Sequence, residues 1–106
     1  MRVLLDACTP RPLRRYLPNH AVQTAQEMGW GQLKNGTLLD QAEAPFDAFI
    51  TTDRNLKHQQ GVPRRSLAIL VLPTNDWPTI RARAAEVTAQ VGALKPGDFV
   101  ELDWGG

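Results

Sequence analysis

The sequence predicts an α/β domain built on a mostly parallel β-sheet of four to five strands. Short apolar runs alternate along the chain with segments whose apolar residues recur every three or four positions, which is the pattern of strands joined by helices. One run, 66–72, is apolar on both faces, as in a strand that helices cover on each side. The length of 106 residues fits a single domain, spanning 1–106.

Five strands are expected, and two of them end in aspartate. They lie at 2–6, 20–24, 46–53, 66–72 and 99–102. The first run, Arg2 to Asp6, is short, apolar and closed by a carboxylate, and the third closes in the same way at Asp53. Because crossovers between parallel strands are right-handed, few arrangements are available. We expect the strand order 2-1-3-4, with a C-terminal edge strand that is either parallel or antiparallel to its neighbour.

Helices are expected between these strands. Thr9 and Pro10 suit the opening of a short helix, because Thr caps and Pro fits the first turn. Asn35 is the expected N-cap of a helix that runs to about residue 44, and a shorter helix is expected at 54–60. The longest helix begins near residue 76. Its apolar residues recur at spacings of three and four, at Trp77, Ile80, Ala84, Val87, Val91 and Leu94.

The composition favours a soluble, cytoplasmic protein. Cys8 is the single cysteine, so no intrachain disulfide forms, which suits a reducing compartment. No stretch approaches the roughly 20 apolar residues of a membrane helix, and we expect no membrane partner. Residues 1–65 hold nine Lys and Arg against six Asp and Glu. This mildly basic half is compatible with a phosphate-bearing partner.

Asp6 and Asp53 are the candidate catalytic and metal-binding residues. If strands 1 and 3 are neighbours, both carboxylates lie at the carboxyl edge of the sheet, where open α/β sheets bind ligands. Oxygen ligands of this kind suit Mg²⁺ or Mn²⁺, which activate water in phosphodiester cleavage. The alternative is structural: Asp6 caps the turn after its strand, and Asp53 caps the helix that follows it.

Several segments resemble one family along nearly the whole chain. Leu4-Leu5-Asp6, the Lys-Asn-Gly at 34–36 and the Thr-Asp-Arg-Asn at 52–55 occur in the order found in the DUF5615 group of PIN-like proteins. The resemblance implies a PIN-like three-layer sandwich and a Mg²⁺- or Mn²⁺-dependent endoribonuclease. Such proteins are often regarded as toxins of toxin–antitoxin pairs, so it also implies RNA as substrate and an antitoxin protein as partner.

The resemblance carries over residue by residue, with two departures. Asp6 and Asp53 match the metal ligands, whereas Ala7 stands where relatives usually carry glutamate, and Asn35 stands where they tend to carry an acid. Asn35 is therefore expected to be an auxiliary catalytic group. With only two charges, the site should hold Mg²⁺ weakly, since anionic oxygen is its main ligand. Phosphate contacts, or alternatively an ordinary polar rim, are expected at Lys34, Arg54, Asn55, Lys57 and His58.

Three other acids and two other functions stay open. Glu27, Asp40 and Asp47 are reserve ligands, although Asp40 suits a solvated helix position and Asp47 a strand start. A PIN-like fold with weakened chemistry would instead act as an RNA- or protein-binding module. A homodimer is a further expectation, with the last edge strand and Trp104 forming its interface.

Overall fold

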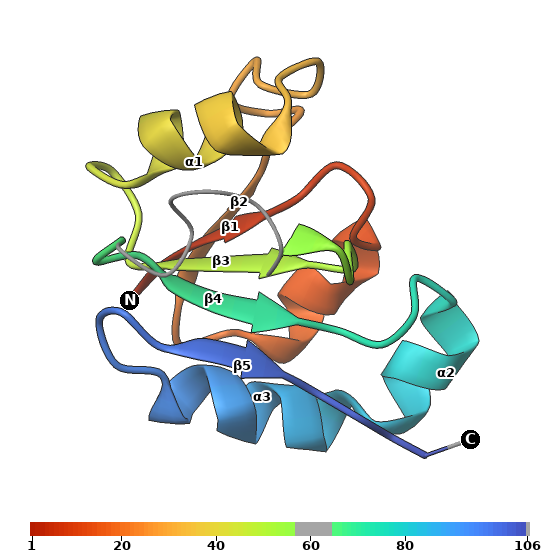
Figure 1. Ribbon diagram of the computed structural model, residues 1–106. Helices are drawn as coiled ribbons and strands as arrows, with labels where there is room; N and C mark the ends of the chain where they lie inside the picture. The colour runs from red at the N-terminus through yellow and green to blue at the C-terminus, as the bar shows by residue number, and fades with distance from the viewer. Residues whose placement is uncertain (57–64, 106) are drawn as a thin grey trace.

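The computed structural model describes residues 1–56 and 65–105, and of Asn35 it describes the backbone alone. These residues form one sheet of five strands in the order β2-β1-β3-β4-β5, and every neighbouring pair is parallel (Figure 1). The strands are β1 (Arg2–Leu5), β2 (Ala21–Thr24), β3 (Ala48–Thr51), β4 (Ala68–Val71) and β5 (Phe99–Glu101). The predicted α/β class, the order 2-1-3-4 and the C-terminal edge strand are confirmed. The antiparallel alternative for that strand is wrong.

The connections contain one 3₁₀ helix and three α-helices in the described part of the chain. They are η1 (Arg11–Tyr16), α1 (Asn35–Ala42), α2 (Trp77–Ala82) and α3 (Ala84–Ala93). The N-cap of α1 is Lys34, with extended backbone and no side-chain cap, so the predicted Asn35 cap is wrong by one residue. Residues 54–56 form a turn, and the rest of the helix expected at 54–60 lies outside the described residues. No helix of the described residues is long and apolar enough to cross a membrane.

The long helix predicted from residue 76 is broken at Arg83. There the backbone leaves the helical region, at φ −118° and ψ 23°, and the Arg83 amide bonds to the carbonyls of Ile80 and Arg81. Contacts at this bend tie the C-terminal segment to α3: the Arg83 guanidinium lies 5.5 Å from the ring centroid of Trp104, whose indole N–H donates to Glu86. Trp104, expected at a dimer interface, thus contacts its own chain.

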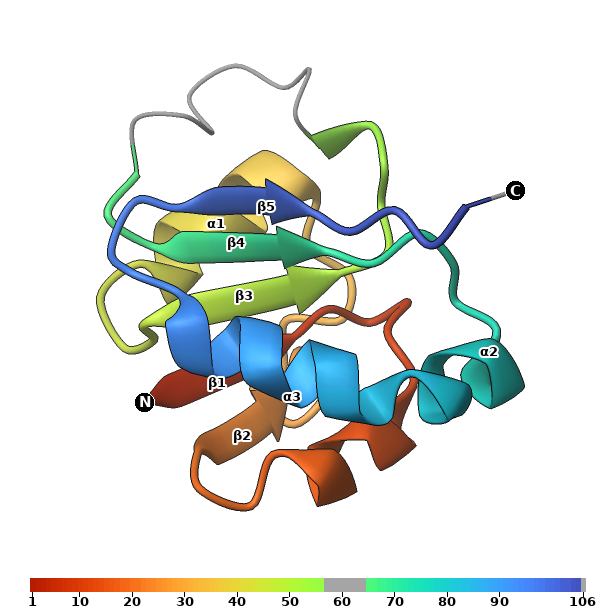
Figure 2. The ribbon, with the colours of Figure 1, turned by 90° about the horizontal axis from the view of Figure 1, so that it is seen from below.

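Helices cover both faces of the sheet, which gives three layers (Figures 1 and 2). Successive strand residues face opposite sides, so each strand contributes to two separate cores. On one face, Leu5 and Ile50 pack with side chains of η1, α2 and α3. On the other face, Leu4 and Phe49 pack with side chains of α1. β3 and the wholly apolar β4 are buried along their full length, as the sequence of 66–72 predicts for a covered strand.

One crossover has the uncommon hand. The β1–β2 connection through η1 and the β4–β5 connection through α2 and α3 run in opposite directions across the sheet, yet both pack on the same face. The two crossovers therefore have opposite hands, and Figures 1 and 2 show that the β4–β5 connection is left-handed. About 98% of such connections are right-handed, so our expectation fails here. The short η1 covers only part of that face, and α3 packs beside it.

Candidate functional site

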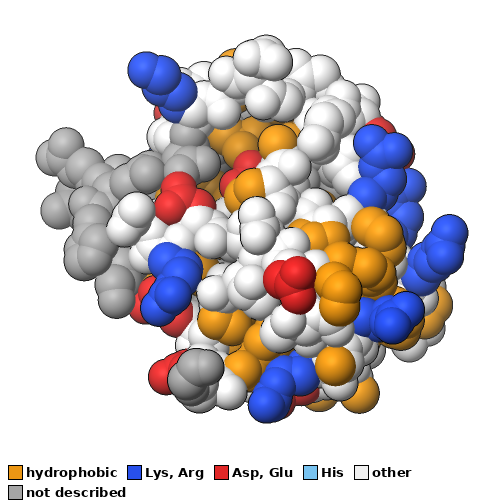
Figure 3. All heavy atoms as spheres, turned by 90° about the vertical axis from the view of Figure 1, so that its right-hand side faces the viewer, with side chains coloured by type: hydrophobic (Ala, Val, Ile, Leu, Met, Phe, Trp, Pro, Cys, Tyr) orange, Lys and Arg blue, Asp and Glu red, His pale blue; other side chains and the backbone are white. Residues whose placement is uncertain are grey.

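The candidate site lies where β1 and β3 end side by side. The chain leaves β1 toward β2 at one edge, whereas β3 is followed by β4 on the other side. Between two such strands, an open parallel sheet has its topological switch point, which is the usual place for a ligand. Asp6 directly follows β1, and Asp53 comes two residues after the end of β3. Figure 3 views the molecule from this side and shows acidic side chains spread singly over the surface.

Asp6 is a buried carboxylate that is held by three donors. Asp6 as a whole residue is only 8% exposed to solvent. Oδ1 accepts from the backbone amide of Ala7 at 2.8 Å, while Oδ2 accepts from the hydroxyl of Thr51 at 2.7 Å and from the thiol of Cys8 at 3.3 Å. Hydrogen bonds to a charged acceptor offset the cost of burying it. The capping role considered for Asp6 is therefore real, and the carboxylate is fixed in position.

Thr51 links the carboxylate of Asp6 to the backbone of Asp53, and the sequence interpretation missed it. Its hydroxyl donates to Asp6 and accepts from the backbone amide of Asp53 at 3.1 Å, and the residue is fully buried. The register between β1 and β3 would have revealed this contact. Leu5 pairs with Ile50, so the next positions, Asp6 and Thr51, also stand side by side and face the same side of the sheet.

Asp53 caps the turn that follows β3, whereas the helix that the structural alternative assigns to it lies mostly outside the described residues. Its Oδ1 accepts from the backbone amide of Asn55 at 3.0 Å, which closes the turn after β3. The residue is partly exposed, in contrast to Asp6. One carboxylate oxygen of Asp53 is therefore already hydrogen-bonded within the protein. The backbone amide of Asp53 is linked through the Thr51 hydroxyl to the buried carboxylate of Asp6.

Cys8 is another neighbour of Asp6. Its thiol, which donates to Asp6, also accepts from the hydroxyl of Thr52 at 3.1 Å. Cys8 is itself an exposed residue. The loop after β1 is thus tied to the end of β3 by side chains as well as by the amide of Asp6, which donates to the carbonyl of Ile50 at 2.9 Å.

The two acids at this edge carry the type of ligand that a hydrated hard cation uses. Mg²⁺ keeps several waters and binds through one or two carboxylates, and Asp6 and Asp53 offer two. The described residues contain no group of three or more His, Cys, Asp or Glu side chains able to hold a metal. Three of the lone pairs on Asp6 already accept protein hydrogen bonds, which reduces what remains for a metal.

Of the predicted phosphate contacts, the structure describes Lys34, Arg54 and Asn55, and none of these three side chains hydrogen-bonds to Asp6. Lys34 is exposed at the N-terminus of α1. The backbone amide of Asn55 donates a hydrogen bond to the Asp53 carboxylate. Arg54 lines a cavity of about 190 Å³ together with Asp103 beyond β5. The side chain of Asn35 is not described, and Lys57 and His58 lie outside the described residues.

The reserve acids have other partners. Glu27 pairs with Arg14, and its pKa is lowered chiefly by the backbone amide of Thr24 and then by Arg14. Asp40 lies on α1 and pairs with Arg65 at 2.8 Å. These two acids are therefore engaged in holding other parts of the fold.

Asp47 lies at the opposite end of β3. Its carboxylate accepts from the backbone amide of Arg2 at 2.8 Å and faces the Arg2 guanidinium, and these contacts lower its pKa. The strand-start role expected for Asp47 is confirmed, and a role at the carboxyl edge is excluded by the direction of β3.

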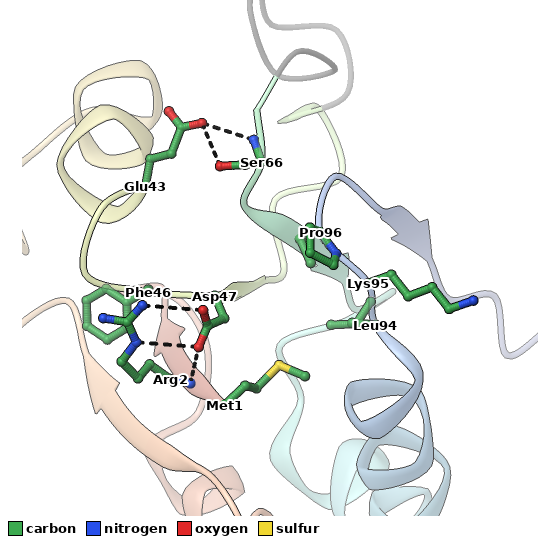
Figure 4. A pocket seen from close by; sticks show the side chains of 10 residues that line it. Met1, Arg2, Glu43, Phe46, Asp47, Ser66, Leu94, Lys95 and Pro96 are labelled. Carbon is green, nitrogen blue, oxygen red and sulfur yellow. Dashed lines mark hydrogen bonds and ion pairs between the residues drawn. The ribbon is translucent and has the colours of Figure 1, made fainter.

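A cavity of about 370 Å³ opens beside Asp47 at the amino end of the sheet (Figure 4). Figure 4 shows the acids of its wall turned toward neighbours of the same chain: Asp47 toward Arg2, and Glu43 toward Ser66. The acidic charges of this wall therefore have internal partners, and the cavity lies at the end of the sheet that open α/β proteins do not usually use.

Comparisons with known proteins do not identify a family. No family model matches the chain, and neither a curated protein nor a solved structure matches it. The resemblance of the Lys-Asn-Gly and Thr-Asp-Arg-Asn segments to the DUF5615 group therefore stays a prediction.

Proposed function

We propose that this protein is a Mg²⁺- or Mn²⁺-dependent endoribonuclease of the PIN-like type that acts as the toxin of a toxin–antitoxin pair. One observation carries the proposal: a buried carboxylate, Asp6, is joined through the Thr51 hydroxyl to the backbone of a second acid, Asp53, at the switch point of a parallel sheet. The sequence resemblance supplies the choice of RNA and of an antitoxin partner.

The reaction is phosphodiester hydrolysis. A water oxygen forms a bond to phosphorus, one P–O ester bond breaks, and the leaving oxygen takes up a proton. Asp6 and Asp53 would hold the metal ion, which when bound supplies positive charge that activates water and stabilises the leaving oxygen. Thr51 and the Ala7 amide orient the Asp6 carboxylate, and Asn35, Lys34 or Arg54 would orient the RNA.

The test measures metal binding before activity. Mn²⁺ is titrated calorimetrically into the wild type, into Asp53→Asn and into the double variant Asp6→Asn, Asp53→Asn. Asp103→Asn is the matched control, because this exposed acid also lies beyond the carboxyl end of a strand. Binding that is lost in the site variants and kept in Asp103→Asn supports the metal site, and Mn²⁺-dependent RNA cleavage with the same dependence supports the function. The thermal melt of each variant confirms that it is folded.

A binding module without chemistry is the second candidate. It is favoured by the three protein hydrogen bonds on Asp6, which already use much of the capacity of that carboxylate. In this case the wild type shows no Mn²⁺ binding at millimolar concentration and no RNA cleavage, yet still binds RNA or a partner protein. That result would remove the nuclease proposal.

A further inference from the structure

A basic surface that the candidate site does not include lies on η1. This helix carries three arginines within six residues. Arg11, Arg14 and Arg15, together with Pro12, line a hollow of about 230 Å³. Guanidinium groups around a hollow suit an anion with several acceptor oxygens, such as a phosphodiester, because each presents a planar fork of donors.

Helix α2 extends this surface with further basic and aromatic side chains. The ring centroid of Tyr16, at the end of η1, lies 5.9 Å from that of Trp77, at the start of α2. The hydroxyl of Thr88 on α3 donates to the Tyr16 carbonyl at 2.7 Å, and this bond joins α3 to the end of η1. Arg81 follows Trp77 by four residues and so lies on the same side of α2. Figure 3 shows Lys and Arg side chains along this side of the molecule, with hydrophobic side chains between them.

Most of the positive charge on this surface is not neutralised. Arg14 pairs with Glu27, and Arg83 pairs with Glu86. Three further arginines are exposed and make no ion pair with a described residue: Arg11, Arg15 and Arg81. Exposed guanidinium groups near aromatic rings are typical of surfaces that bind single-stranded nucleic acid.

The amino end of this surface follows the candidate site directly along the chain. The loop from Asp6 to Thr9 connects them, and it is closed by the Thr9 amide, which donates to the Asp6 carbonyl at 2.9 Å. Pro10 then leads directly into η1. The amino end of η1, where Arg11 stands, therefore begins near the carboxyl edge at which Asp6 is held.

We propose that Arg11, Arg15 and Arg81, with Tyr16 and Trp77, bind the backbone and bases of single-stranded RNA and lead it to the edge of the sheet at Asp6. The choice of RNA rather than DNA rests on the proposed function. The phosphates pair with the arginines, and an exposed base stacks on Tyr16, which is 37% exposed.

The experiment measures RNA binding without metal, so that it does not depend on catalysis. Fluorescence anisotropy follows a labelled single-stranded RNA of about 12 nucleotides in EDTA, over a range of salt concentrations. Each phosphate contact contributes about 0.7 to the slope of log affinity against log salt. At about 0.1 M salt, Arg15→Gln should therefore weaken binding about fivefold, and Arg11→Gln with Arg15→Gln about 25-fold.

Lys95→Gln is the matched control. It removes the same charge from an exposed residue at the opposite end of the sheet, and that residue makes no ion pair with a described residue. Tyr16→Leu keeps the charge and removes the aromatic ring, and should weaken RNA binding about fivefold or more. Loss of affinity in the arginine variants and in Tyr16→Leu, with Lys95→Gln close to the wild type, supports the proposal.

Three results would overturn it. Equal losses in Arg15→Gln and Lys95→Gln would show attraction by net charge alone, and a wild type that does not bind RNA at low salt would remove the surface altogether. Competition by poly-glutamate as strong as by RNA, with Tyr16→Leu unchanged, would assign the surface to an acidic protein segment instead. Arginine-dependent RNA binding without Mn²⁺-dependent cleavage would keep this inference and contradict the nuclease.

Discussion

Replacing Thr51 by valine tests whether one hydroxyl holds the candidate site together. Valine keeps the β-branched shape and fits β3, so the change removes two hydrogen bonds with little change in packing. The Asp6 carboxylate loses its donor at 2.7 Å, and the Asp53 amide loses its acceptor at 3.1 Å. A hydrogen bond to a charged group contributes about 1.5–3 kcal/mol, and a neutral one about 1 kcal/mol.

The free energy of unfolding should therefore fall by about 2–4 kcal/mol in Thr51→Val. Urea denaturation, followed by circular dichroism, measures this as a midpoint lower by on the order of 1–2 M, with the slope unchanged. A domain of ordinary stability, about 5–15 kcal/mol, would still be folded in water.

Thr9→Val is the matched control for this prediction. Thr9 is also buried, but its hydroxyl donates to the neutral carbonyl of Ile50 at 3.1 Å, and that carbonyl still accepts from the Asp6 amide after the substitution. We expect a cost of about 1 kcal/mol. If Thr51→Val costs no more than Thr9→Val, then Thr51 does not stabilise a buried carboxylate, and our account of the site is wrong.

Four further predictions concern the scaffold. Phe49→Ala should destabilise the protein by about 3–5 kcal/mol in urea denaturation, because Phe49 is fully buried; a cost below 1 kcal/mol would contradict the packing. Asp76→Ala should cost about 1 kcal/mol, measured in the same way, since Asp76 caps α2. Gly97→Ala should lower the melting temperature, because Gly97 has φ +84° in the turn before β5. The Arg2 amide and guanidinium lower the pKa of Asp47, so ionisation of Asp47 favours the folded state. As the pH falls below the ordinary pKa of 3.8, the free energy of unfolding should therefore fall more in the wild type than in Asp47→Asn. Parallel curves of unfolding free energy against pH for the two proteins would refute this.

The sheet was predictable because its information is local. Alternating apolar runs and helix-period segments reveal five strands and their order of connection, and a doubly apolar run such as 66–72 identifies a covered strand. Two strands that end in aspartate, when placed side by side, put Asp6 and the backbone of Asp53 at one edge. The sequence by itself therefore determined the α/β class, the strand order and the edge of the sheet at which Asp6 and Asp53 lie.

Tertiary structure decided what surrounds those aspartates. From the sequence alone, Thr51 is an ordinary strand residue. Its contact with Asp6 follows only from the register in which β1 and β3 pair. The turn between α2 and α3 at Arg83 interrupts an apolar periodicity that continues through it, so periodicity alone could not reveal it.

The hand of the β4–β5 crossover and the basic surface also required the folded chain. Nothing in the strand sequences fixes which face receives α3, because β4 is apolar on both sides and accepts helices on either. That choice places α2, which carries Arg81, against the end of η1 through the Tyr16–Trp77 ring contact, although the two elements are about 60 residues apart in sequence. Local sequence patterns indicate which segments form strands and helices. Which distant segments become neighbours is decided by how the layers pack.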